Sequence, residues 1–288
     1  MLALLIRQEV TPPTPTPNSL RTTRLLTNGR VVRVFYPEQD AHPMTRTTAA
    51  VHRREIVGLL RANAGPRSLP VVFDDFVETA ALTLRNAVDI RGRGEREARY
   101  LAIADRYSRE ELDRFARAIG LTVLAMEAKP SDVLGRLYME LELGNDRLGQ
   151  VYTPDDVARL MAAMTIGDVV DQVVAHGFAE LYEPACGAGG FIVAMTEEMG
   201  AHGLDHQTQL HVTAEDLSRK AVHMIYIHLA LLGVPAIIRH QDTLTREVFS
   251  IWPTPDHLLG GWGPRLQRRS DLNASADTDL TSPTEKEK

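Results

Sequence analysis

The stretch that decides the fold is Glu183-Pro184-Ala185-Cys186-Gly187-Ala188-Gly189-Gly190-Phe191, a glycine-rich segment that follows an apolar run. Glycine allows the backbone to take a positive φ and allows a ligand to approach the chain closely. No Lys-Ser or Lys-Thr follows these glycines, so the segment is not a phosphate-binding P-loop. Glu183 instead places a carboxylate beside the turn, which favours a cationic ligand. The segment predicts a strand that ends at Glu183, a ligand-binding turn and a helix.

Strands and helices continue to alternate after this turn. A second apolar run, Leu210–Ala214, predicts a strand that leads to Glu215-Asp216, and the apolar run Ala221–Leu232 predicts a helix. A third strand is expected at Ala236–Arg239, ahead of Asp242. This β-α-β-α-β order predicts an α/β fold with a parallel sheet and right-handed crossovers.

Acidic residues at the ends of these strands are candidates for ligand contacts. Asp216, or its neighbour Glu215, can accept hydrogen bonds from ribose hydroxyl groups, as an acid does in dinucleotide-binding folds. Because side chains alternate along a strand, only one of these two acids is expected to face the ligand. Asp242 is placed to bind the exocyclic amine of an adenine ring, and its alternative role is to cap the turn that begins at Thr243.

The rest of the chain divides into further segments. Residues 1–45 are expected to be extended or disordered, because proline and threonine alternate there. Residues 46–145 show helical periodicity and predict a helical domain, whereas residues 266–288 are polar and predict a disordered tail. The α/β domain therefore occupies residues 146–265, and Thr153-Pro154 predicts the start of its first helix with Thr153 as the cap.

The composition limits the classes of function. The formal net charge is −6, whereas a protein that binds duplex DNA by itself displays a basic balance, so any contact with nucleic acid needs a local basic patch or a partner. The single cysteine, Cys186, excludes an internal disulfide and a cysteine-rich zinc site, and it fits a reducing cytoplasm. No apolar run reaches the length of a membrane span without a charged residue or a histidine. We expect a cytoplasmic protein that uses neither a membrane nor a metal.

Four motifs, in this order, resemble the methylation subunits of type I restriction-modification systems, which are adenine-N6 DNA methyltransferases of the N-6 DNA methylase family. The motifs are Gly149-Gln150-Val151-Tyr152-Thr153-Pro154, Glu183–Phe191, Ala214-Glu215-Asp216-Leu217 and Gln241-Asp242-Thr243-Leu244. Upstream, the segment from Asp132 to Tyr138 looks like the one that joins the helical domain of those proteins to their catalytic domain. The resemblance covers roughly residues 130–245.

This resemblance implies a Rossmann-like methyltransferase fold that binds S-adenosylmethionine and acts on DNA. It also implies a specificity subunit or a complementing methyltransferase subunit as a partner. By the same resemblance, the cofactor site would be lined by Thr153, Pro154, Glu183, Pro184, Ala185, Cys186, Gly187, Gly189, Asp216 and Asp242.

The sequence departs from the family at the catalytic motif. The family's chemistry rests on an Asn-Pro-Pro-aromatic tetrapeptide after the fourth strand, whose amide holds the adenine amine while the aromatic ring stacks on the flipped base. No Asn-Pro-Pro or Asp-Pro-Pro occurs in this sequence. The fourth strand is expected at Asp256-His257-Leu258-Leu259-Gly260, at or near an exposed edge of the sheet. Trp262, beyond it, is either a base-stacking residue or a packing plug.

Other chemistries lack the residues that they need. Cytosine-C5 methylation requires a cysteine nucleophile after a proline, whereas Cys186 follows Ala185 and is expected to be a small packed residue of the turn. His223 and His228 are five residues apart, so they face different sides of their helix and cannot hold zinc together. Each is expected to be a partly buried or exposed helix residue.

The sequence is compatible with three functions. The first is a DNA methyltransferase subunit whose missing strands and tetrapeptide come from another polypeptide. The second is a degenerate methyltransferase that acts as an interaction or regulatory protein. The third is a methyltransferase for a small molecule or a protein, which requires a base near the cofactor, and His257 is the candidate for that base.

Overall fold

The computed structural model describes residues 46–141, 143 and 152–281, together with three strand segments nearer the N-terminus. These strands pair in the antiparallel order β1-β3-β2. The expectation of extended or disordered chain at residues 1–45 does not include this pairing of strands. The bounds are β1 (Ile6–Gln8), β2 (Leu20–Thr27) and β3 (Arg30–Pro37).

Helices α1 to α5 follow and pack around an aromatic core. The ring of Phe115 lies 5.7 Å from that of Phe76 and 4.9 Å from that of Tyr107, measured between centroids. A capping box starts α4: the hydroxyl of Ser108 accepts from the N–H of Glu111 (3.3 Å), and the N–H of Ser108 donates to the Glu111 carboxylate (2.7 Å). The bounds are α1 (Arg46–Ala62), α2 (Leu69–Asn86), α3 (Arg93–Ala104), α4 (Arg109–Ala128) and α5 (Val133–Glu140).

The α/β part forms a four-stranded sheet in the order β4-β5-β6-β7. The strands β4, β5 and β6 are parallel, and the helices between them complete the predicted β-α-β-α-β unit. The bounds are α6 (Asp155–His176), β4 (Ala179–Glu183), α7 (Gly190–Ala201), α8 (His206–Gln209), β5 (Leu210–Asp216), α9 (Arg219–Leu232), β6 (Ala236–Asp242), β7 (Glu247–Pro253), α10 (Pro255–Leu259) and α11 (Trp262–Thr281).

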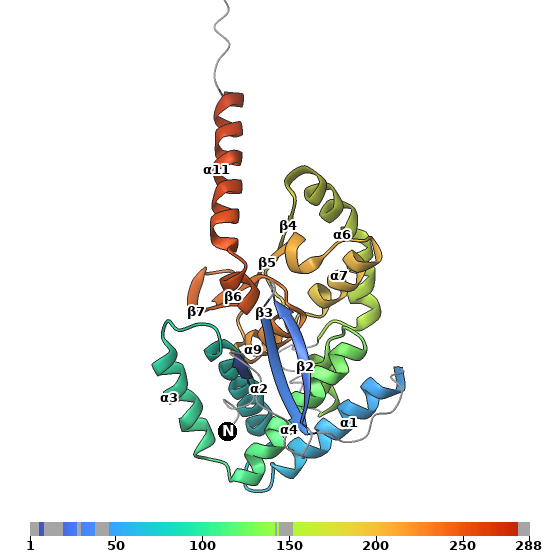
Figure 1. Ribbon diagram of the computed structural model, residues 1–288, viewed down its shortest axis with the longest axis vertical. Helices are drawn as coiled ribbons and strands as arrows, with labels where there is room; N and C mark the ends of the chain where they lie inside the picture. The colour runs from blue at the N-terminus through green and yellow to red at the C-terminus, as the bar shows by residue number, and fades with distance from the viewer. Residues whose placement is uncertain are drawn as a thin grey trace, which may run out of the picture.

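Helix α9 lies between the sheet and α2 (Figure 1). On the sheet side, Trp252 of β7 packs against His223 and Tyr226 of α9, at ring-centroid distances of 4.9 and 5.3 Å. Because α9 is covered on both sides, apolar residues occur all around it. His223 and His228 are both fully buried here, so the prediction of partly buried or exposed histidines is wrong.

The fourth strand differs from the prediction in position and in direction. β7 covers Glu247–Pro253 and runs antiparallel to β6. Residues Asp256–Leu259, where the sequence analysis expects a strand, belong instead to the short helix α10, because Pro255 fits the first turn of a helix. The expected edge position is correct for β7. The other edge is β4, the strand that leads into the glycine-rich turn.

Residues 266–281 belong to helix α11, where the sequence predicts a disordered tail, and residues 282–288 of that predicted tail lie outside the described residues. The helix continues to Thr281 and projects away from the rest of the molecule (Figure 1). Near its base, Arg269 donates to the carbonyl oxygen of Phe178 (3.0 Å) and pairs with Glu180 of β4 (3.1 Å). No glycine or proline interrupts the chain between Arg265 and Thr281, so the helix can continue beyond this anchor. None of the described helices combines the length and the hydrophobicity needed to cross a bilayer.

Candidate cofactor site

The glycine-rich turn joins β4 to α7 in a conformation that requires glycine. Gly187 has a φ of +54° and Gly189 a φ of +89°. A Cβ atom at Gly189 would lie 2.7 Å from Cγ1 of Ile225 on α9, and one at Gly187 would lie 3.2 Å from Cδ1 of Tyr152. The backbone conformation and the packing therefore both exclude a larger residue at Gly189.

Asp216 of β5 binds directly to this turn. Its Oδ2 accepts from the N–H of Gly187 (2.8 Å), and its Oδ1 accepts from the N–H of Ser218 at the start of α9 (2.7 Å). Burial raises the pKa of Asp216 above its ordinary value, and these two hydrogen bonds oppose the shift. Each carboxylate oxygen retains a second lone pair with which it can accept from a ligand.

Glu215, the alternative candidate, faces away from the turn. Its carboxylate is buried and accepts from the Tyr182 hydroxyl (3.0 Å), the Gln241 amide (3.0 Å) and the Thr243 hydroxyl (3.2 Å). Asp216 and Glu215 therefore have separate roles: Asp216 contacts the glycine-rich turn, and Glu215 links β4, β5 and the end of β6.

The segment before α6 lies against the turn. The ring of Tyr152 contacts the position of a Gly187 side chain, and the carbonyl oxygen of Thr153 would lie 3.8 Å from a Cβ atom at Gly190. The helix starts one residue later than predicted, with Pro154 rather than Thr153 at the N-cap and no side-chain cap. Thr153 and Pro154 are both exposed beside the turn.

The residues that enter the turn fold back on themselves. The carboxylate of Glu183 accepts from the N–H of Ala185 (3.2 Å). The carbonyl oxygen of Pro184 accepts from the Thr243 hydroxyl (2.8 Å), which connects the end of β4 to the end of β6. Pro184 and Ala185 are exposed and Glu183 is half-buried, so the lead-in to the turn is open to solvent.

Cys186 is a packed residue of the turn. Its N–H donates to the carbonyl oxygen of Glu215 (2.9 Å), and its own carbonyl oxygen accepts from the N–H of Gly189 (2.8 Å). Burial raises the pKa of its thiol well above the ordinary value, so the thiol stays protonated. These contacts give Cys186 a structural position without the features of a nucleophile.

Asp242 caps the turn between β6 and β7. Its Oδ1 accepts from the N–H groups of Leu244 (2.9 Å) and Thr245 (3.2 Å), which lower the pKa of the carboxyl. This is the capping role that the sequence left open for Asp242. The same carboxylate also stands at the carboxyl end of β6, so the capping role does not remove it from the candidate site.

Three carboxylates thus gather at one end of the sheet. Glu183, Asp216 and Asp242 end β4, β5 and β6, which are neighbours in the sheet. Ligands of open α/β sheets bind at this end, beside the helix that follows a glycine-rich turn. The arrangement fits a ligand that carries positive charge together with hydroxyl and amine groups.

His257 and Trp262 lie at the opposite end of the sheet. Nδ1 of His257 is 2.9 Å from Nε2 of His211, which stands at the start of β5, and the ring of Trp262 packs 5.3 Å from that of His211. Strand β5 separates His211 from Asp216 by roughly 16 Å, at ~3.3 Å per residue. Trp262 is 1% exposed and also packs on Phe178, so it is a packing plug and not a base-stacking residue. His257 is likewise too far away to act as a base at the candidate site.

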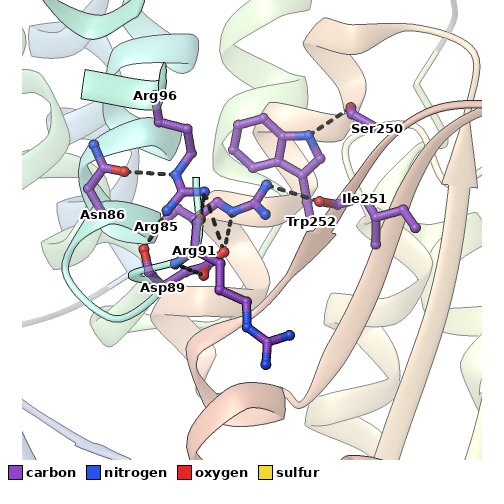
Figure 2. A network of polar contacts seen from close by, with 8 residues as sticks. All are labelled: Arg85, Asn86, Asp89, Arg91, Arg96, Ser250, Ile251 and Trp252. Carbon is purple, nitrogen blue, oxygen red and sulfur yellow. Dashed lines mark hydrogen bonds and ion pairs between the residues drawn. The ribbon is translucent and has the colours of Figure 1, made fainter. Parts of the chain in front are cut away.

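The helical region contacts the α/β part at two places, one of them beside the candidate site. Lys220 of α9 pairs with Asp74 of α2 (3.0 Å) and lies over the ring of Tyr138 (4.6 Å), whose ring contacts Tyr152 (5.3 Å). The contact between α2, the loop that follows it and β7 is polar (Figure 2).

In that polar contact, Arg85 donates to the carbonyl oxygen of Ile251 (2.9 Å), pairs with Asp89 (3.0 Å) and lies over the Trp252 ring (4.9 Å). Arg96 supports the same loop through Asn86 (2.8 Å). Arg85 therefore binds a main-chain oxygen of the edge strand β7, as Arg269 binds that of Phe178 ahead of the other edge strand.

Two buried polar residues, Asp132 and His228, lie behind the turn, and the sequence does not predict this position for either of them. Asp132 caps α5 by accepting from the N–H of Gly135 (2.7 Å), and its Oδ1 lies 3.9 Å from Nδ1 of His228. Asp132 lies in a segment without a local signal for a ligand contact, and His228 lies in an apolar helix where its spacing carries no signal. Only the folded structure brings these residues to the glycine-rich turn.

The fold and the site define a Rossmann-like α/β domain preceded by helices. Residues 131–259 match the family model described as N-6 DNA Methylase. Over 132 residues the chain is 30% identical to the type I restriction enzyme MjaIX methylase subunit of Methanocaldococcus jannaschii. The aligned part is 43% of this chain and 21% of that relative, so the chain spans about a fifth of the relative's length.

Solved structures show weaker overall similarity. A Listeria monocytogenes protein described as a class I S-adenosylmethionine-dependent methyltransferase is 13% identical with a TM-score of 0.38, over 67% of this chain and 54% of that one. The methyltransferase subunit of a type I restriction-modification system from Streptococcus thermophilus is 16% identical with a TM-score of 0.36, over 68% of this chain and 59% of that one.

Proposed function

We propose that this chain carries the S-adenosylmethionine-binding part of an adenine-N6 DNA methyltransferase of the restriction-modification type. The observation that carries the proposal is the bond between Asp216 and Gly187, which fixes an acidic side chain against a glycine-rich turn at the carboxyl end of a parallel sheet. The match of residues 131–259 to the N-6 DNA methylase family supports the choice of cofactor and substrate.

The residues of the turn fit this cofactor. S-adenosylmethionine supplies, when bound, a methyl group on a positively charged sulfur. Gly187 and Gly189 give the turn its positive-φ backbone, Asp216 offers its free lone pairs to the ribose hydroxyls, and Asp242 offers its second oxygen to the adenine amine. Glu183 would then stand near the charged end of the cofactor. Thr153, Pro154, Pro184, Ala185 and Cys186 shape the surrounding main chain.

Methyl transfer needs residues beyond those of this chain. The sequence holds no Asn-Pro-Pro or Asp-Pro-Pro, and Trp262, the aromatic residue nearest the expected position, is buried at the far end of the sheet. We infer that a complementing methyltransferase polypeptide supplies the amide that holds the target amine. The net charge of −6 likewise favours a partner, such as that polypeptide or a specificity subunit, as the source of most phosphate contacts to DNA.

Two alternatives differ in what they require of the site. A degenerate methyltransferase that acts as an interaction protein is favoured by the missing tetrapeptide, and it predicts no methyl transfer under any condition. A methyltransferase for a small molecule or a protein required His257 near the cofactor, and the bond of His257 to His211 removes that support.

Ultraviolet crosslinking with S-adenosylmethionine tritiated on its methyl group tests the proposal. The purified chain should be labelled, and an excess of S-adenosylhomocysteine should compete. Unmethylated plasmid DNA should gain no tritium from the chain alone, but should gain it when a polypeptide that carries Asn-Pro-Pro-aromatic is added from a neighbouring reading frame. Tritium in the DNA with the chain alone would contradict the proposal that a second polypeptide supplies the catalytic residues. Absence of label in the protein would contradict the cofactor site.

A further inference from the structure

His228 on α9 connects two segments that are far apart in the sequence. Its side chain is completely buried. Nδ1 lies 2.8 Å from the carbonyl oxygen of Ala188, in the middle of the glycine-rich turn. Nε2 accepts from the N–H of Leu134, in the first turn of α5 (3.2 Å). One imidazole ring therefore joins the turn to the start of α5.

These two partners fix the protonation of the ring. The N–H of Leu134 can only donate, so Nε2 carries no proton. The carbonyl oxygen of Ala188 can only accept, so Nδ1 carries the proton. Burial lowers the pKa of His228, which agrees with the neutral ring that this pattern requires. A charged imidazolium would lose the bond to Leu134.

The same face of α9 supports the turn a second time. Ile225, three residues before His228, lies where a side chain of Gly189 would be, at 2.7 Å from a Cβ atom there. On the α5 side, Asp132 accepts from the N–H of Gly135 and leaves no room for a side chain at Gly135. The turn is thus held between a packing contact at Gly189 and a hydrogen bond at Ala188.

We propose that His228 is a positioning residue of the cofactor site, which holds the glycine-rich turn in its ligand-ready conformation by bonding Ala188 to Leu134. We call the two hydrogen bonds of His228, to Ala188 and to Leu134, the His228 clamp. Its effect on S-adenosylmethionine rests on the proposed function, but the clamp itself is a property of the free protein. When the turn is already ordered in the free protein, binding loses less conformational entropy. Loss of the clamp therefore weakens the affinity for the ligand.

His228→Leu removes both hydrogen bonds and keeps an apolar side chain in the helix. His228→Asn keeps a donor for Ala188 and loses the acceptor for Leu134. His223→Leu is the matched control, because His223 is a buried histidine on the same helix that packs on Trp252 and does not contact the turn. All three are compared with the wild-type full chain, and thermal unfolding tests whether each variant is folded.

Hydrogen exchange in the absence of cofactor measures the clamp directly. Peptides that span residues 186–190 should exchange about tenfold faster in His228→Leu, as expected for the loss of one buried hydrogen bond, and should be unchanged in His223→Leu. Calorimetric titration should give about tenfold weaker binding of S-adenosylmethionine for His228→Leu and a smaller loss for His228→Asn.

The exchange and titration results test the His228 clamp and the proposed cofactor binding separately. Unchanged exchange at the turn in His228→Leu would overturn the clamp, whatever the cofactor does. If His228→Leu does not fold, His228→Asn carries the test through faster exchange at the start of α5, and wild-type exchange there would overturn the clamp. Absence of S-adenosylmethionine binding by the wild type would overturn the proposed function and leave the exchange result to decide the clamp.

Discussion

Asp216 and Gly187 meet through a 2.8 Å hydrogen bond from the glycine N–H to Oδ2 of the carboxylate, which joins the end of β5 to the turn after β4. The second oxygen of Asp216 binds the N–H of Ser218, so one side chain orders the turn before α7 and the start of α9 together. The residue that donates this bond, Gly187, has a positive φ, which glycine adopts more readily than any other residue.

Gly189→Ala should destabilise the protein and remove cofactor binding. The residue has a φ of +89° and its Cβ atom would lie 2.7 Å from Ile225, so we expect a loss of about 2–4 kcal/mol in the free energy of unfolding, measured with urea. Gly200→Ala is the control, because Gly200 lies within α7 with nothing near its Cβ position. That variant should be neutral or slightly more stable. Equal effects of the two substitutions would contradict the geometry of the turn.

Asp256→Asn should stabilise the protein more at pH 8 than at pH 5. Asp256 is buried, its Oδ2 has no hydrogen-bond partner among the described residues, and burial raises its pKa from 3.8 to about 7. A carboxyl with a raised pKa contributes stability below about pH 3.8 that is lost as the pH rises to about 7. Asparagine carries no charge at either pH, so the difference in Tm between variant and wild type should grow across this window. A difference that is the same at both pH values would show that Asp256 is not buried as described.

The pH profile of the wild type itself should combine opposing groups. Burial lowers the pKa of His211 to about 3 and that of His223 to about 4, so the stability that these histidines contribute rises with pH up to about 6.5, which opposes Asp256. For this reason the comparison of Asp256→Asn with the wild type is more informative than either profile alone.

Arg85→Ala should loosen the attachment of the helical region to β7. The side chain of Arg85 binds Asp89, the Ile251 carbonyl oxygen and the Trp252 ring, so we expect a loss of about 1–3 kcal/mol in the free energy of unfolding. Arg91→Ala is the control, because the side chain of Arg91 points away from this network (Figure 2). Its effect should stay within about 0.5 kcal/mol. A similar loss for both variants would contradict the special role of Arg85.

The sequence predicts the central part of this fold for physical reasons that can be named. The glycines at 187 and 189 and the apolar runs before Glu183, Glu215 and Asp242 are local signals, and the structure has the expected strands and turn at those places. Alternation along β5 required that only one of Glu215 and Asp216 face the turn, and only the structure identifies Asp216 as that residue.

The parts that the sequence did not predict depend on contacts between distant segments. β7 follows a tight turn and pairs antiparallel, and no local pattern distinguishes such a strand from the parallel one expected later in the chain. Helix α11 is anchored by Arg269 on Phe178, 91 residues away, so its polar composition alone resembled disorder. In the sequence, His228 is a polar residue in an apolar helix. Its contact with the glycine-rich turn joins residues that are far apart in the chain, so no local pattern predicts it.

Calorimetric titration of the full chain with S-adenosylmethionine, repeated with Asp216→Ala and with Asp205→Ala, measures whether the carboxylate of Asp216 holds the cofactor. Asp205 is an exposed acid that caps α8 away from the turn, so it controls for the loss of a capping carboxylate. We expect binding by the wild type and by Asp205→Ala, and binding at least about tenfold weaker by Asp216→Ala, because the ribose contacts and the order of the turn are lost together. Equal binding by all three proteins, or no binding by the folded wild type, would contradict this expectation.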